Sequence, residues 1–554
     1  MSIDTEDASG KIVKLYGLGL TEKDLNQRNV GLGFAEGDAT VNGQSMYRQI
    51  LKMATTSDLT DDQVNNIGYE TTKKSAENSK KIANQAADLI VGKGKKWEAK
   101  IKYDADGIGP EEIKEETVVI RDEKGNIDIP SFTKWLNDEE FFFGREGSAY
   151  WTDTVKNGLK ANSDLNKYVD ELRKFHYDQL LSEKNKATKH GSITNEEFYY
   201  GGLSAFKAYE QFKKTTQDYG RKFFANPVPD YDIQTYDFAR REFSGVGAYN
   251  SGIQKFMFNV DPYFSLPKWS VTSFANHESM MGHHNQLMYA QRYLSSVGEF
   301  GKYKLGNVFH YTSYVEGWAL FMEWFGIEAG FYGTPDYDNK DGDLYAMPVD
   351  FSTAHGITNF FTAKTEAEVT NDMIQQIKDL HNGVYWNKVA QVNKYENQDK
   401  KHAMDAVKLA NLLQYQGALN EAQLRNMRLA LDTAYHGKGV KGHEDLPAGA
   451  SINQVREFMK KNSSLGIGDI TSESRRYLSY VGQATSYNSG KAVMMDLYTK
   501  VQKKLGLTRR EFVEKDDHKY VKEFFDALLR NSALPMDALI KSVSAKYGLT
   551  VEKK

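Results

Sequence analysis

Three of the twelve histidines lie within eight residues, in the stretch HESMMGHH at positions 277–284. Glu278 directly follows the first of them, His277. Neutral imidazoles are good zinc ligands, and a carboxylate beside the first ligand can take a proton from water at the open coordination position. The stretch therefore predicts a helical zinc site in which His277 is a ligand and Glu278 is the general base.

The second ligand is either His283 or His284. In a straight helix, which turns about 100° per residue, His283 lies about 240° around the axis from His277. His284 lies about 340° around it, but about 10.5 Å further along the helix. One metal therefore requires either that the rings of His277 and His284 lean inward, or that a break at Gly282 brings His283 round. The spacing leaves both arrangements open, and without a metal these would be packed or surface histidines.

The composition restricts the ligands and partners. The chain has 554 residues, a net charge of −4 from 71 basic and 75 acidic side chains, and no cysteine. Disulfides and thiolate metal sites are therefore excluded, and any metal is held by His, Asp or Glu. We expect no nucleic-acid partner, because such a protein would need a basic stripe. Residues 1–27 contain no apolar signal segment, and no apolar run of about 18 residues predicts a transmembrane helix.

The stretch 277–284 resembles the HExxxGHH signature of the bacterial domain-of-unknown-function 885 (DUF885) family, which groups with the gluzincin-like metallopeptidases. Members usually have proline before that glycine, where this chain has Met281. The resemblance implies a mainly α-helical fold with a small β component, a bound Zn²⁺ and a peptide substrate. It covers roughly positions 40–90 and 196–554.

A second motif, YVEGWAL at 314–320, resembles the family's Y-x-E-G-W-A-L. A zinc site with two histidines needs a third ligand, and gluzincin-type sites take it from a glutamate on a following helix. The resemblance therefore implies that Glu316 is this ligand, with Gly317 letting another helix approach. Glu323, in phase with Glu316 after seven residues, is a candidate for the second shell or an alternative ligand. The competing interpretation is a glutamate in an ordinary salt bridge.

Arg428, Asp432 and His436 share one stripe of a predicted helix at 421–436, since they are spaced four residues apart. The family shows the same three residue types. We expect His436 to donate to a developing oxyanion while Asp432 fixes its tautomer. A charged triplet on a solvated helix face is the alternative.

The stretches RY at 476–477 and GQATSYNSGK at 482–491 also resemble the family pattern. The resemblance suggests that Tyr487 hydrogen-bonds an oxyanion and that Arg476 and Lys491 hold a substrate carboxylate. A core tyrosine and surface cations are the alternatives. The other His-Glu pair, His443-Glu444, has no further histidine nearby and predicts no site.

The predicted organisation has four parts. Residues 1–40 form a polar lead-in, 41–92 the N-terminal helical part of the core, 93–195 an inserted segment, and 196–554 the metallopeptidase core. Within the insertion, 118–122 and 127–129 suggest a β-hairpin, and a capped helix is expected from Ser163 to about Lys184. Strands are expected at 244–249 and 256–260, just before the histidine helix.

The sequence thus favours a zinc-dependent peptide hydrolase, either a carboxypeptidase or an endopeptidase. The rival hypothesis is a non-catalytic peptide-binding protein that retains a structural metal site. The resemblance slightly favours a secreted or cell-surface location, consistent with a leader removed from this chain. Nothing in the sequence points to an oligomeric state.

Overall fold

The structure is a computed structural model that describes residues 2–6, 9, 11–16, 20–105, 112–172, 193–226, 228–241, 246–303, 309–340, 342–392, 395–465 and 467–550. The fold is mainly α-helical with a small β component, as the sequence predicts. Most of its buried apolar side chains form one large cluster, which extends along the chain from Ile82 to Val543.

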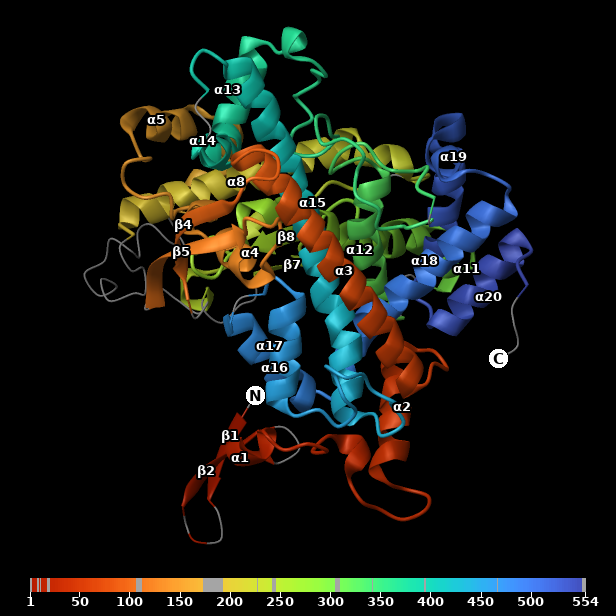
Figure 1. Cartoon of the computed structure of the whole chain (residues 1–554). Helices are drawn as coiled ribbons and strands as arrows, with labels where there is room; N and C mark the ends of the chain where they lie inside the picture. The colour runs from red at the N-terminus through yellow and green to blue at the C-terminus, as the bar shows by residue number, and fades with distance from the viewer. Residues whose placement is uncertain are drawn as a thin grey trace.

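Two long antiparallel helices, α3 (Asp61–Ile90) and α15 (Asp399–His436), run side by side through the molecule (Figure 1). The side chain of Thr60 caps the start of α3 by accepting a hydrogen bond from the Gln63 N–H. The two backbones approach closely at Gly68, where a Cβ atom would lie only 2.5 Å from the backbone nitrogen of Ala430. Several of the helices described below pack against this pair.

The β component consists of three small sheets. β1 (Ser2–Glu6), β2 (Ile12–Tyr16) and β3 (Leu20–Thr21) form the first, and β4 (Trp97–Asp104) and β5 (Ile113–Arg121) the second. In the third, β8 (Lys255–Phe258) lies between β6 (Asp232–Thr235), which is parallel to it, and β7 (Gly247–Asn250), which is antiparallel. β7 and β8 correspond to the two strands expected before the histidine helix, whereas β6 was not predicted.

The predicted hairpin at 118–129 is paired differently. Its first strand is part of β5, which pairs along its whole length with the preceding β4. A turn does follow at 122–126, but beyond it only Ile127 bridges back to Arg121, and α4 (Ile129–Leu136) begins at once. Trp97 and Ile101 of β4 are buried, so pairing with this longer apolar partner is favoured over pairing with the short segment that remains before α4.

The segments expected to be a lead-in and an insertion both contact the helical core. The Leu32 N–H donates to Nδ1 of His436, 2.9 Å away. Trp97, Phe132 and Trp135 belong to the large hydrophobic cluster. Of the helix expected from Ser163, the structure describes α6 (Asn166–Leu172), and the rest lies outside the described residues. The four predicted boundaries remain predictions.

The remaining helices surround the central pair. Those before the histidine motif are α1 (Glu22–Leu25), α2 (Gly43–Thr55), α5 (Asp153–Ala161) and α8 (Asn195–Asp218). The motif helices are α9 (Val271–Glu278), α10 (His283–Met288), α11 (Gly298–Tyr303) and α12 (Thr312–Glu328). The C-terminal half contains α13 (Asn371–Asp379), α14 (Val384–Ala390), α16 (Ile452–Asn462), α17 (Ile467–Ser479), α18 (Ser486–Lys504), α19 (Arg509–Leu529) and α20 (Met536–Tyr547). Within the part of the chain that the structure describes, no helix has both the length and the apolarity needed to cross a bilayer.

Candidate metal centre

The histidine stretch is interrupted by a sharp turn. α9 ends with His277 and Glu278, and α10 begins at His283. The turn packs so tightly that a Cβ on Gly282 would lie 1.8 Å from the carbonyl oxygen of His277. The Gly282 carbonyl also accepts a hydrogen bond from Nε1 of Trp318 on α12, at 3.1 Å. The structure therefore has the second of the two arrangements, in which a break at Gly282 brings His283 round.

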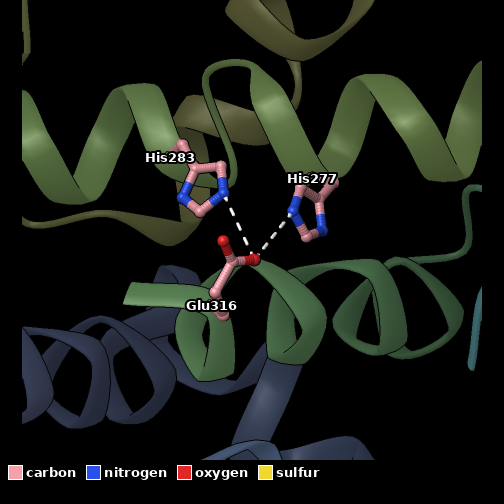
Figure 2. A group of neighbouring side chains, drawn as sticks. All are labelled: His277, His283 and Glu316. Carbon is pink, nitrogen blue, oxygen red and sulfur yellow. Dashed lines mark ion pairs between the residues drawn. The ribbon is translucent and has the colours of Figure 1, made fainter. Parts of the chain in front are cut away.

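His277, His283 and Glu316 face one another across this turn (Figure 2). Oε2 of Glu316 lies 3.5 Å from Nε2 of His277 and 3.7 Å from Nε2 of His283. One ligand atom from each residue lies within 4.8 Å of the other two. The two histidines come from the consecutive helices α9 and α10, and the glutamate comes from α12 on the opposite side (Figure 2).

Close helix packing positions Glu316. The next residue, Gly317, lies against α18, and a Cβ there would be 2.8 Å from the Cα of Gly490. A Cβ on Gly490 would in turn lie 1.7 Å from the carbonyl oxygen of Ser313. Only a pair of glycines lets the two backbones come this close. The expectation that Gly317 permits a close helix approach is confirmed.

Glu323 and Tyr249 hold the two motif residues in orientation. Oε1 of Glu323 lies 2.7 Å from Nδ1 of His277 and accepts its proton, which turns Nε2 toward Glu316. The backbone N–H of Tyr249, in edge strand β7, donates to Oε2 of Glu278 at 2.7 Å. The other carboxylate oxygen of Glu278 lies 4.0 Å from Nε2 of His277. Glu278 is thus fixed beside the three grouped residues without being one of them.

The electrostatics of the group favour a bound cation. Burial works against protonation of His277, but its hydrogen bonds with Glu316 and Glu323 and the charge of Glu278 raise its pKa well above the ordinary value. Burial likewise tends to raise the pKa of Glu316, but the hydrogen bond with His277 and the charges of both histidines lower it to about 2. Burial and the charge of His277 lower the pKa of His283 to about 4. Near neutral pH the Glu316 carboxylate is therefore ionised and the His283 imidazole is neutral, which are the forms that bind a metal ion.

Glu278 has the acidity suited to a general base. Burial raises its pKa to about 7, against the opposing charge of His277 and the hydrogen bond from Tyr249. A carboxylate that titrates near neutral pH can both accept and return a proton at the working pH.

The grouped donors fit a zinc ion. Two imidazole nitrogens and one carboxylate oxygen are the ligand set of several catalytic zinc sites. Ligand atoms about 2.1 Å from a tetrahedral zinc are roughly 3.4 Å apart, close to the observed separations of 3.5 and 3.7 Å. Both Nε2 atoms lie near the same carboxylate oxygen, so the three donors are grouped around one point.

His284, the alternative second ligand, is turned away from this group. Its Nδ1 lies 2.7 Å from the Tyr249 hydroxyl, and its Nε2 lies 2.6 Å from the carbonyl oxygen of Pro229. Both ring nitrogens are thus engaged, so His283, which is grouped with His277 and Glu316, is the candidate for the second ligand that the geometry favours. The residue instead ties α10 to the sheet and to the loop before it.

His436 lies in the core, and its predicted role in stabilising an oxyanion remains a prediction. The ring is completely buried, and its two nitrogens bond the Leu32 N–H and the Tyr477 carbonyl. Asp432 does not orient it, because the Asp432 carboxylate accepts hydrogen bonds from the Tyr47 hydroxyl at 2.8 Å and the Gly482 N–H at 2.9 Å. Both residues join the N-terminal segment and the α17–α18 region to α15.

Arg428 and Arg476 share one carboxylate. Arg428 donates to Oε2 of Glu473, and Arg476 donates to Oε1 of Glu473 and to the side chain of Gln483. The guanidinium carbon of Arg428 also lies 4.7 Å from the ring centre of Tyr487. The predicted roles of Arg476 in substrate binding and of Tyr487 in oxyanion stabilisation remain predictions.

Lys491 is buried rather than at the surface. Its ammonium lies 4.9 Å from the ring centre of Tyr345, and burial lowers its pKa to about 8. The charges that act on it come from Glu323 and Arg425, so it lies on the Glu323 side of His277. A role in holding a substrate carboxylate remains a prediction for this residue.

Two residues of the site were missed from the sequence. Tyr249 lies in a strand that was predicted, but a backbone N–H leaves no signal in a sequence. Arg425 lowers the pKa of both Glu278 and Glu316, so its guanidinium lies within electrostatic reach of the group. The sequence does contain a signal for Arg425, because it lies one helical turn before Arg428 and so shares the helix face that was singled out.

Comparison with known proteins gives a family match over most of the chain. The model of the family described as "Bacterial protein of unknown function (DUF885)" matches residues 31–344 and 402–543. The matched residues contain all three sequence motifs, at 277–284, 314–320 and 476–491. No curated protein matches the chain significantly.

Two solved structures are similar to the chain. One is described as "the putative lipoprotein from Colwellia psychrerythraea", with 15% identity, a TM-score of 0.48, and coverage of 95% of this chain and 57% of that chain. The other is described as "a putative lipoprotein of unknown function from Shewanella oneidensis", with 16% identity, a TM-score of 0.35, and coverage of 70% and 56%. The chain spans just over half the length of each of these proteins.

Proposed function

The chain belongs to the DUF885 family of bacterial proteins of unknown function, and we propose that it is a zinc-dependent peptide hydrolase with a gluzincin-like site. The observation that carries the proposal is the convergence of Nε2 of His277, Nε2 of His283 and Oε2 of Glu316 beside the carboxylate of Glu278. A purely structural zinc would be closed by a fourth protein ligand, whereas this group has three ligands and an adjacent base.

His277, His283 and Glu316 would hold the metal, with Glu323 orienting His277. When bound, zinc supplies a Lewis acid that polarises a carbonyl group and acidifies water. Glu278 accepts the proton of the attacking water at the oxygen nearer His277 and later passes it to the leaving nitrogen. The Tyr249 N–H keeps the other oxygen of Glu278 in place, so the proton-accepting oxygen has a defined direction.

A peptide is the substrate class that the surroundings favour. Strand β7 is at the edge of its sheet, and its Tyr249 contacts Glu278 directly. An extended peptide can pair with such an edge and pass in front of the base. Tyr487 is proposed as the oxyanion donor in preference to His436, because both ring nitrogens of His436 are engaged within the core. A secreted or cell-surface location remains a prediction from the family resemblance.

The test is the replacement Glu278→Gln, which keeps the size of the side chain but removes its ability to accept a proton. Hydrolysis of a random peptide pool by the zinc-loaded protein should fall by roughly 10²- to 10⁴-fold. Zinc content, measured by atomic emission, should stay at one per chain because Glu278 is not a ligand. The matched control is Glu444→Gln, which alters the exposed glutamate of the other His-Glu pair and should leave both quantities unchanged.

Two outcomes would contradict the proposal. Unchanged hydrolysis in Glu278→Gln would mean that another group is the base. If the zinc-loaded wild type binds peptides without cleaving any, the chain is a peptide-binding protein that retains a metal site.

A further inference from the structure

Two arginines lie on one face of α15, a helix that also packs against the histidine helix α9. Arg425 and Arg428 are three residues apart and therefore neighbours on the helix surface. Arg428 is anchored by Glu473, with its Nε and Nη2 3.2 and 3.0 Å from one carboxylate oxygen, and its guanidinium lies over the ring of Tyr487. Arg425 pairs through Nη1 with Glu421, one turn earlier.

The packing of α18 connects this arginine pair to the metal-binding residues. Tyr487, under Arg428, precedes Gly490 by one helical turn, and Gly490 lies against Gly317, the neighbour of Glu316. The positive charge of Arg425 acts on Glu278 and Glu316 together. The two guanidinium groups therefore lie on the side of the site that is bounded by α15 and α18.

Both guanidinium groups keep hydrogen-bond donors beyond those used by their internal partners. A guanidinium carries five N–H groups. Nε of Arg425 is buried and has no hydrogen-bond partner among the described residues. Nη1 of Arg428 has no hydrogen bond to any described residue, since its contacts with Glu473 and Tyr477 use Nε and Nη2. By contrast, Arg476 directs one amino group to Glu473 and the other to Gln483.

Donors left over on a buried or half-buried cation are costly unless a ligand satisfies them. A planar guanidinium matches a carboxylate in charge and in the spacing of its donors, and paired arginines bind carboxylates more strongly than neutral groups do. Arg428 lies over Tyr487, and α18 carries this ring one helical turn from the Gly490–Gly317 contact that adjoins Glu316. A carboxylate bound by the two arginines would therefore belong to the same peptide as the scissile bond.

We propose that Arg425 and Arg428 form a carboxylate-binding subsite that selects peptides with a carboxylate close to the scissile bond. The inference rests on the proposed function, because it assigns the substrate class of that site. The carboxylate is either the C-terminal one of the peptide or that of an acidic side chain. The predicted carboxylate-binding role of Arg476 would then pass to Arg425, with Arg476 and Glu473 positioning Arg428.

The test measures binding separately from hydrolysis. Calorimetry in the Glu278→Gln background compares three probes, namely acetyl-dialanine, its C-terminal amide, and acetyl-glutamyl-alanine amide. At least one of the two acids should bind roughly 10- to 100-fold more tightly than the neutral amide, as expected for a charge-assisted bidentate contact. Arg425→Gln should abolish this difference, and Arg425→Lys, which keeps the charge but not the planar fork, should retain part of it.

The control is Arg530→Gln. Arg530 also pairs with an acid one helical turn earlier, Asp526, but it lies at the exposed end of α19. This variant should keep the full preference for acids. Tighter binding of acetyl-dialanine identifies a C-terminal carboxylate, and tighter binding of the glutamyl probe identifies an acidic side chain. Equal binding of all three probes, or an unchanged preference in both Arg425 variants, would overturn the subsite. An arginine-dependent preference in a protein that cleaves no peptide would support the subsite while refuting the hydrolase.

Discussion

The most informative perturbation of the metal centre is Glu323→Gln. The Glu323 side chain is 2% exposed, and its carboxylate accepts the Nδ1 proton of His277 at 2.7 Å. Glutamine keeps the length of the side chain and an acceptor oxygen, but it removes the negative charge. His277 can therefore keep its orientation while losing the charge that makes Nε2 a better donor to a metal.

The expected loss follows from that single contact. Hydrogen bonds to charged groups contribute about 1.5–3 kcal/mol and neutral ones about 1 kcal/mol, so the change costs on the order of 1–2 kcal/mol. This corresponds to roughly a 10-fold loss of zinc affinity, at the lower end of the roughly 10- to 100-fold range for residues that support a metal ligand. Glu316→Gln should weaken binding more, because it removes an anionic ligand.

Zinc dissociation constants from competition with a chromophoric chelator would measure this ranking. Glu328→Gln is the matched control, since Glu328 is an equally buried carboxylate on α12 that pairs with Arg509 instead. It should lower the melting temperature but keep wild-type zinc affinity. If Glu323→Gln weakened zinc binding more than Glu316→Gln, the ligand assignment would be reversed. A wild-type affinity in both variants would place the metal elsewhere.

Three further predictions test the surrounding structure. Gly282→Ala should open the turn between α9 and α10, because its Cβ would collide with the His277 carbonyl; both the melting temperature and the zinc content should fall, and a normal zinc content would show that the turn is not required. His284→Ala should keep one zinc per chain while reducing the free energy of unfolding by about 1–3 kcal/mol, measured in urea, whereas loss of the zinc would restore His284 as a ligand. Burial raises the pKa of Asp432 to about 7, so between about pH 4 and pH 7 the folded chain holds a proton that the unfolded chain has released. The contribution of Asp432 to stability should therefore decrease as the pH rises through this window, by up to about 1.4 kcal/mol per pH unit, and Asp432→Asn should remove that slope from urea unfolding curves.

The residue types of the metal centre could be predicted from the sequence because their chemistry is local. A histidine followed by a glutamate on a helix already supplies a candidate ligand and a candidate base, and the glycine after Glu316 already indicates a close helix contact. The predominance of helices likewise follows from apolar residues repeated at helical spacing. None of these features depends on which distant segment lies opposite.

The choice between His283 and His284 could not be made in the same way. Helical periodicity gives directions only for an unbroken helix, and the break depends on partners far along the chain. Trp318 holds the Gly282 carbonyl from α12, and Met281 packs where Gly220 leaves room for its sulfur. These contacts stabilise the turn in which His283 faces Glu316 and His284 contacts the Tyr249 hydroxyl.

His436 shows the same limit for a helix that was correctly predicted. Spacing placed Arg428, Asp432 and His436 on one stripe, but it could not show whether that stripe faces a site or the core. The tertiary structure buries α15 on nearly all sides, so the three side chains bind Glu473, Tyr47 and Leu32 instead of a substrate.

By itself, the sequence therefore determined which residue types could act as metal donors and base and predicted the helices that carry them, since these depend on residue type and on spacing within a few turns. Only the tertiary structure decided which donors meet and which strand pairs with β5. The physical reason is that these contacts join residues far apart in the chain, and their free energy depends on packing complementarity that no local pattern encodes.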